Sequence, residues 1–202
     1  LGSSLEYITE VFGYEKMLPM NSGAEAVETA IKICRKWGYE IKNVENNKAK
    51  ILVCNGNFHG RTTTVVSFSS HSGSKEHFGP LTSGFEIIPY NNTDELESRL
   101  LNDKNIVGFL VEPIQGEGGV VVPDDGYLKK CKKLCKKHNV LLIADEIQTG
   151  VCRTGKLLAS HHENIQPDIV ILGKALSGGF YPVSGVLTSK KIMSVMKVGQ
   201  HG

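Results

Sequence analysis

The stretch that decides the fold is VLLIADEIQTG, residues 140–150, together with IVILGKALSGG, residues 169–179. Each begins with an apolar run of four or five residues and then changes to charged, polar and glycine residues. Short runs that are apolar throughout are typical of strands buried on both faces of a parallel sheet. Asp145 follows the first run and Lys174 follows the second, so opposite charges are expected where two neighbouring strands end.

Other apolar segments predict further strands, and amphipathic segments between them predict helices. The remaining strands are expected at residues 51–53, 65–66, 86–88, 107–111 and 183–187, and the helices at residues 24–39, 94–101, 126–138 and 189–196. This alternation predicts an α/β fold with a mostly parallel sheet that carries helices on both faces. In such sheets ligands bind beyond the carboxyl ends of the strands, where both charges are expected.

The composition is that of one soluble globular domain, with 40% hydrophobic and 22% charged residues. A net charge of +2 gives no reason to expect nucleic acid or an anionic membrane as a partner, so small substrates fit better. The longest apolar runs are far shorter than the roughly 20 residues that a membrane span needs. Five cysteines without a CxxC pair predict reduced thiols in an intracellular protein.

Asp145 and Lys174 have two interpretations from the sequence alone. They could form a buried ion pair, although such pairs add little stability because desolvation offsets their attraction. They also match the needs of pyridoxal phosphate, which uses a lysine to hold its aldehyde and a carboxylate beside its pyridine nitrogen. The second interpretation explains both residues, and it makes further demands that can be checked.

The cofactor's phosphate needs a helix N-terminus, and its ring needs an aromatic neighbour. Residues 18–20 are the expected end of a short strand, and residues 21–26, NSGAEA, follow it. Ser22, Gly23 and Ala24 lie where a long helix is expected to begin. Residues 57–61, NFHGR, follow another strand and offer Phe58 or His59 to the ring and Arg61 to a substrate carboxylate. Glu112 and Glu117 lie in the glycine-rich stretch after a third strand.

Competing motifs are incomplete. Residues 150–156 match the first positions of a P-loop, but Leu157 stands where that loop needs Ser or Thr to hold magnesium. The segment 116–119 lacks the third glycine of a dinucleotide-binding loop, and 161–163 lacks the spacing of an HExxH zinc site. The sequence therefore predicts no bound metal.

Ordered sequence blocks resemble the class III aminotransferases, a family with the fold-type-I pyridoxal-phosphate fold. The match covers about residues 7–202 and includes the blocks at 20–23, 35–39, 58–62, 111–122, 144–150 and 172–179. The resemblance implies that residues 1–20 end an N-terminal segment and that residues 21–202 form part of the large cofactor-binding domain. It also implies a small C-terminal domain that this chain does not contain.

The resemblance also implies individual roles. Lys174 corresponds to the lysine that holds the cofactor, Asp145 to the partner of the pyridine nitrogen, and Gln148 to the group that binds the ring hydroxyl. The family's phosphate-binding turn is matched by Gly23 and Ala24, next to Ser22. The aromatic residue that stacks on the cofactor ring is matched by Phe58, next to His59. Arg61 resembles the carboxylate clamp, Glu117 the gating acid, and Glu112 an acid close to the site.

The blocks at 35–39, 121–128 and 172–184 favour the branch of the family that moves the δ-amino group of ornithine to a 2-oxo acid, expected to be 2-oxoglutarate. The products would be glutamate 5-semialdehyde and glutamate. The sequence FHGRT at 58–62 is instead typical of acetylornithine enzymes, because His59 stands where ornithine enzymes often have Trp. Acetylornithine or 4-aminobutyrate transamination, or a non-catalytic subunit, are the alternatives.

The family's proteins are homodimers with shared active sites, which implies a homodimer here. Cytoplasm is the expected compartment, with the mitochondrial matrix as the alternative.

Overall fold

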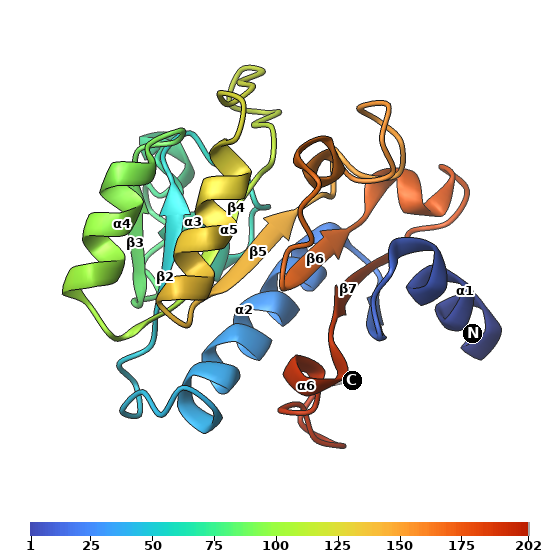
Figure 1. Cartoon of the computed structure of the whole chain (residues 1–202), viewed down its shortest axis with the longest axis horizontal. Coiled ribbons are helices and arrows are strands. Elements are labelled where there is room, and N and C mark those ends of the chain that lie inside the picture. The colour runs from blue at the N-terminus through green and yellow to red at the C-terminus, as the bar shows by residue number, and fades with distance from the viewer. Residues whose placement is uncertain (202) are drawn as a thin grey trace.

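The computed structural model describes residues 1–201 and contains a seven-stranded sheet with helices around it (Figure 1). The strands are β1 (Lys16–Met20), β2 (Lys50–Cys54), β3 (Phe85–Ile88), β4 (Ile106–Val111), β5 (Leu141–Asp145), β6 (Ile169–Leu172) and β7 (Ser184–Thr188). The α-helices are α1 (Gly2–Phe12), α2 (Gly23–Glu40), α3 (Thr63–Ser67), α4 (Thr93–Asn102), α5 (Tyr127–Lys137) and α6 (Lys190–Met193). Short 3₁₀ helices are η1 (Ser72–Ser74), η2 (Ala159–Glu163) and η3 (Lys174–Ser177).

The strand order is β1-β7-β6-β5-β4-β2-β3. Pairing is parallel from β6 through β5, β4 and β2 to β3, whereas β7 is antiparallel to both of its neighbours. The prediction of a mostly parallel sheet is therefore confirmed. Because parallel strands end at the same edge, the loops after β2, β4, β5 and β6 all leave from one edge of the sheet.

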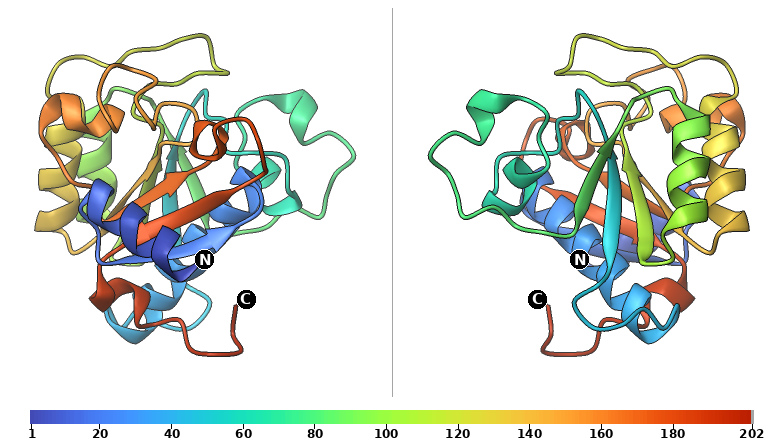
Figure 2. Two further views of the ribbon diagram at one scale, coloured as in Figure 1. Left: turned by 90° about the vertical axis from the view of Figure 1, so that its right-hand side faces the viewer. Right: turned by 90° about the vertical axis from the view of Figure 1, so that its left-hand side faces the viewer.

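Helices cover both faces of the sheet, as the sequence predicted. Helix α2 packs against β4, β5, β6 and β7 on one face, while α4 and α5 pack together on the other. Figure 2 shows α4 and α5 on one side of the sheet and the segment with α3 and η1 on the opposite side. Within residues 1–201, no helix is both long and apolar enough to cross a membrane.

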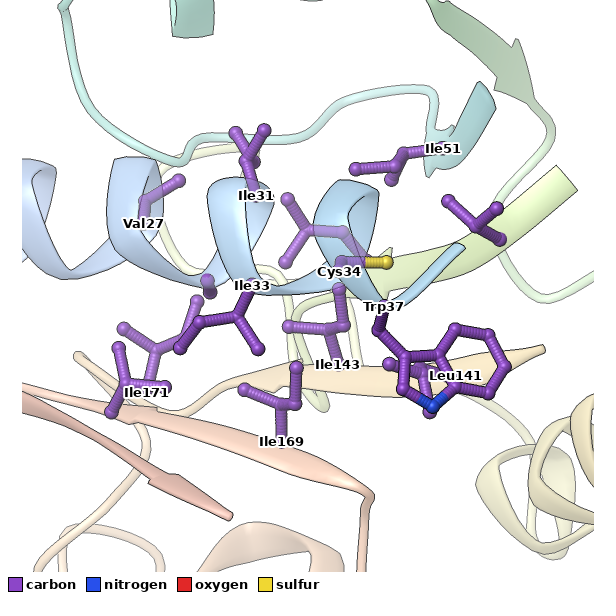
Figure 3. Close-up of a cluster of buried hydrophobic side chains, with 14 of the residues drawn as sticks. Val27, Ile31, Ile33, Cys34, Trp37, Ile51, Leu141, Ile143, Ile169 and Ile171 are labelled. Carbon is purple, nitrogen blue, oxygen red and sulfur yellow. The ribbon is translucent and has the colours of Figure 1, made fainter. Parts of the chain in front are cut away.

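Alternating side chains of the buried strands supply the two halves of the core. Leu141 and Ile143 of β5 face α2, whereas Leu142 belongs to the cluster beneath α4 and α5. Figure 3 shows Ile143 against Cys34 of α2. A Cβ added to Gly108 would lie 2.4 Å from Cys34 Sγ, so this glycine lets α2 pack closely on β4.

Two expectations about elements need correction, and one helix was not predicted. Residues 65–66 were predicted to be a strand but lie inside α3, because the Thr62 hydroxyl accepts a hydrogen bond from Val65 N and begins a helical turn. The helix expected at 189–196 is only α6, which ends at Met193. No helix was predicted before β1, where α1 buries Phe12 against the sheet.

Candidate functional site

A cavity of about 200 Å³ lies at the carboxyl edge of the sheet. Its walls come from the loops after β2, β4, β5 and β6 and from the first turn of α2. The lining residues are Gly23, Ala24, Phe58, His59, Gly60, Glu112, Ile114, Asp145, Ile147, Gln148, Thr149 and Lys174. The prediction that the strand ends form a ligand site therefore agrees with the position of this cavity.

Asp145 is the last residue of β5 and is only 5% exposed. Its Oδ2 lies 2.7 Å from His59 Nδ1, and its Oδ1 accepts a hydrogen bond from Ile147 N at 3.1 Å. The His59 ring is buried, and its Nε2 has no hydrogen-bond partner among residues 1–201. These contacts hold the Asp145 carboxylate in one orientation in the cavity wall, without a lysine or arginine partner in the described chain.

Lys174 begins η3 directly after β6 and Gly173. Its ammonium group donates a hydrogen bond to Gln148 Oε1, and the side chain is exposed to the cavity. Lys174 has a φ of 39°, a conformation that is uncommon for residues other than glycine and that is concentrated at functional sites. The buried Asp145–Lys174 ion pair that the sequence allowed does not form.

The N-terminus of α2 supplies backbone donors at the opposite wall. Ser22 caps the helix: its hydroxyl accepts a hydrogen bond from Glu25 N at 3.3 Å, and Glu25 Oε2 accepts one from Ser22 N at 2.7 Å. The first turn of α2 lines the cavity with Gly23 and Ala24, and the first amides of a helix have no partner within the helix. Free amides at a helix N-terminus favour an anion, such as a phosphate group.

Glu112 follows β4 and is 7% exposed. Its Oε1 accepts a hydrogen bond from Phe58 N at 2.7 Å, and its Oε2 accepts one from Gly116 N at 3.3 Å. Burial raises the pKa of the Glu112 carboxyl above its ordinary value, although His59 and the Phe58 amide act in the opposite direction. Phe58 itself lies on the cavity wall, where a planar ring could stack on it.

A second, more open cavity of about 630 Å³ lies on the other side of Phe58. Arg61 and Glu117 both line it, together with serines and His71 of the 69–74 segment. The Arg61 guanidinium lies 5.6 Å from the centre of the Phe58 ring. A substrate that occupies both cavities would therefore meet Phe58, a cation and an anion in turn.

The structure brings most of the predicted site residues together. Eight of them surround the first cavity: Gly23, Ala24, Phe58, His59, Glu112, Asp145, Gln148 and Lys174. Arg61 and Glu117 lie on the second cavity instead. Ser22 lines neither cavity, and its hydroxyl bonds to Glu25. Their roles in binding stay predictions.

The sequence interpretation did not single out Glu146 or Thr149. Glu146 is fully buried, and its carboxylate accepts hydrogen bonds from the Thr149 hydroxyl, Ala159 N at 2.9 Å and Ser160 N at 2.8 Å. These bonds hold the turn that carries Gln148 against η2. A second acid directly after Asp145 points to the opposite face of the strand end, and that alternation was the available signal.

The chemistry that this geometry offers is specific. One wall offers amides to an anion, another offers an aromatic ring, and Asp145 supplies a buried carboxylate that could stabilise a protonated ring nitrogen. Lys174 supplies a primary amine next to an amide oxygen. Within residues 1–201, no cluster of three or more histidine, cysteine or acidic side chains is arranged to hold a metal ion.

Comparison with known proteins places this geometry in a family. Over its full length the chain is 57% identical to mitochondrial ornithine aminotransferase of Drosophila melanogaster and covers 47% of it. It matches ornithine aminotransferase of Toxoplasma gondii with a TM-score of 0.98 at 51% identity, covering all of this chain and 48% of that one. It matches acetylornithine aminotransferase of Elizabethkingia anophelis with a TM-score of 0.85 at 54% identity, covering all of this chain and 46% of that one.

The chain thus spans about half the length of the curated relatives that it matches. The family model for class-III aminotransferases matches residues 1–202. This chain belongs to the class-III aminotransferase family.

Proposed function

We propose that the full-length protein is a pyridoxal-phosphate-dependent aminotransferase that uses the first cavity as its cofactor site. The observation that carries this proposal is the convergence of Lys174, Asp145 and the α2 N-terminus on one small cavity. The family match supports it, as does a similar structure from Toxoplasma gondii that is described with partial occupancy of pyridoxal phosphate at its active site. The residues fit the cofactor's three distinct groups: an aldehyde, a pyridine nitrogen and a phosphate.

When bound, the cofactor would withdraw electrons from the substrate carbon that loses its proton. The chain's own residues would do the rest. Asp145 would keep the ring nitrogen protonated, with His59 and Ile147 N fixing the orientation of its carboxylate. The amides of Gly23 and Ala24 would bind the phosphate, and Phe58 would contact the ring. Lys174 Nζ would hold the cofactor between turnovers and then move a proton at the substrate carbon.

We propose ornithine as the amino donor, with transfer of its δ-amino group to 2-oxoglutarate. Relatives named ornithine aminotransferase that are 57% and 51% identical over the length of this chain support this choice. Acetylornithine is the second candidate, because the chain is also 54% identical to the acetylornithine aminotransferase and carries the FHGRT sequence with His59. 4-Aminobutyrate is the third candidate. The presence of Lys174 argues against a non-catalytic subunit.

We also propose that the full-length protein works as a homodimer with shared active sites, with residues 21–202 as part of the large domain. For the compartment we propose the cytoplasm, although the Drosophila relative is named as mitochondrial. Sedimentation of the purified full-length protein and cell fractionation test these two proposals separately.

A side-by-side assay tests the substrate proposal. Purified full-length protein is supplied with ornithine, acetylornithine or 4-aminobutyrate, each with 2-oxoglutarate, and glutamate is measured. Ornithine should give the highest kcat/KM, and glutamate semialdehyde should appear with it. A higher value with acetylornithine would replace ornithine as the donor, and no glutamate from any donor would overturn the proposed activity.

A further inference from the structure

Two loops at the carboxyl edge of the sheet are joined by the hydrogen bonds of two buried side chains. The first loop, residues 55–61, follows β2, and the second, residues 112–121, follows β4. Because β2 and β4 are parallel neighbours, the loops leave the sheet side by side. Glu112 accepts a hydrogen bond from Phe58 N of the first loop at 2.7 Å and one from Gly116 N of its own loop at 3.3 Å.

Gln115 makes the second connection. Its Nε2 donates to Asn55 O at 2.7 Å, and the residue is only 4% exposed. The backbone of Gln115 also pairs with Val121, with N–O distances of 3.0 and 2.9 Å, which closes the second loop on itself. We refer to the side chains of Glu112 and Gln115 as the loop clamp.

The loops also touch directly, which makes the clamp sensitive to small changes. A Cβ added to Gly118 would lie 2.5 Å from Gly56 O, a distance at which the backbone would have to move. The two loops are therefore packed against each other as well as hydrogen-bonded. A change in one loop should be transmitted to the other without passing through the sheet.

The functional interest lies in what each loop carries. The first loop carries Phe58 and leads to Arg61, and the second carries Glu117. Arg61 and Glu117 line the same cavity, yet no ion pair joins them within residues 1–201. The backbones of the two loops bring this cation and this anion to one cavity, and the loop clamp joins these backbones.

We propose that Glu112 and Gln115 are positioning residues that set the spacing of Arg61 and Glu117 and thereby tune the binding of a dicarboxylate 2-oxo acid. This inference rests on the proposed function. A dicarboxylate is attracted by Arg61 and repelled by Glu117, so its binding depends steeply on their spacing. Lys174 and Asp145 follow other strands, so the loop clamp should affect binding more than the chemical step.

The test compares three variants in the full-length holoenzyme. Glu112→Gln keeps the shape but exchanges one acceptor oxygen for an NH₂ group that faces a backbone N–H. Gln115→Met removes only the bond to Asn55. Glu163→Gln is the matched control, because Glu163 also accepts hydrogen bonds from two backbone N–H groups. The donors are Leu128 at 3.3 Å and Lys129 at 2.7 Å, both on α5, and Glu163 lines neither cavity.

The expected result is a rise in KM for 2-oxoglutarate of about tenfold in Glu112→Gln, the factor that corresponds to the loss of one charge-assisted hydrogen bond. Gln115→Met should raise this KM by roughly threefold, as the loss of one neutral hydrogen bond implies. The kcat should change less than this KM in either variant. Hydrogen exchange should become faster at residues 55–61 and 112–121 together, whereas Glu163→Gln should change neither KM nor exchange in these loops.

The proposal is overturned if KM stays constant in both clamp variants, or if kcat falls while KM does not change. It is also overturned if exchange increases in only one loop. Failure of the proposed function would give a different result, because the unaltered full-length protein would then lack activity with every donor. The exchange experiment needs no turnover, so it tests the coupling of the loops in that case too.

Discussion

Charged side chains have different partners at the two edges of the sheet. At the amino edge, opposite charges pair: Lys50 lies 2.7 Å from Glu86 and 2.8 Å from Asp103, and Lys132 lies 2.6 Å from Asp168. At the carboxyl edge, the carboxylates of Glu112, Asp145 and Glu146 are buried and bound by N–H and O–H donors and His59, and Lys174 pairs with an amide oxygen.

This difference separates stabilising charges from functional ones. Ion pairs at the amino edge neutralise themselves and leave nothing for a ligand. At the carboxyl edge, the protein orients charged groups without pairing them with one another, which is the arrangement that preorganised sites require. Substitutions at the carboxyl edge should therefore alter activity or cost much stability, whereas substitutions at the amino edge should do neither.

Lys174→Ala should have the largest effect on activity. The variant removes both the amine that would hold the cofactor and the proton carrier, so kcat of the full-length protein should fall by roughly 10³-fold or more. Because the side chain is exposed, thermal unfolding should be nearly unchanged. Steady-state kinetics and a melting curve check both points, and a variant with normal turnover would break the comparison of the two edges.

Asp145→Asn should have the second-largest effect on activity. The change keeps the shape but removes the buried negative charge, so a ring nitrogen would lose its proton and kcat should fall by about 10²-fold. Cofactor should still bind through Lys174 and the α2 N-terminus. Absorbance spectra measure the bound cofactor, and kinetics measure turnover. Unchanged kcat would show that the negative charge of Asp145 has no catalytic role.

Glu146→Gln should act on stability. The glutamine retains one acceptor oxygen and presents an NH₂ group where the carboxylate now accepts three hydrogen bonds. We expect a loss of about 3 kcal/mol in the free energy of unfolding. Urea titration of the full-length protein provides the value. A loss as small as that of an exposed ion pair would mean that the turn bearing Gln148 is held by other contacts.

Lys132→Met should have the smallest effect. The ion pair with Asp168 is partly exposed, so its loss should cost about 0.5 kcal/mol. Asp168 keeps its bond from Leu142 N at 2.8 Å, and kcat and KM should match those of the unaltered protein. A change in kinetics of more than the assay error would contradict the assignment of this edge to structure alone.

The sequence was sufficient to predict the sheet, because the buried strands are apolar throughout and are followed by polar residues. Strand ends such as Asp145, Lys174 and Glu112 could therefore be assigned to one edge before the structure was known. The α2 N-terminus was predictable as well, because Ser22 and Glu25 have the spacing of a capping box.

Contacts between segments distant in sequence could not be predicted. The His59–Asp145 bond joins residues 86 positions apart, and nothing in either local sequence indicates it. The loop clamp depends on the close approach of Gly118 to Gly56, which only the packing of two loops reveals. At residues 65–66, two β-branched valines suggested a strand, but the Thr62 cap and the tertiary position of the segment favour a helix.

The most direct test of the central claim is to identify the lysine that holds the cofactor. The full-length protein is loaded with pyridoxal phosphate, reduced with borohydride to make the attachment permanent, digested and analysed by mass spectrometry. We predict that the cofactor's mass appears on the peptide that contains Lys174, and that Lys174→Ala removes it. Attachment at a different lysine, or none at all, would contradict the assignment of the carboxyl edge as the cofactor site.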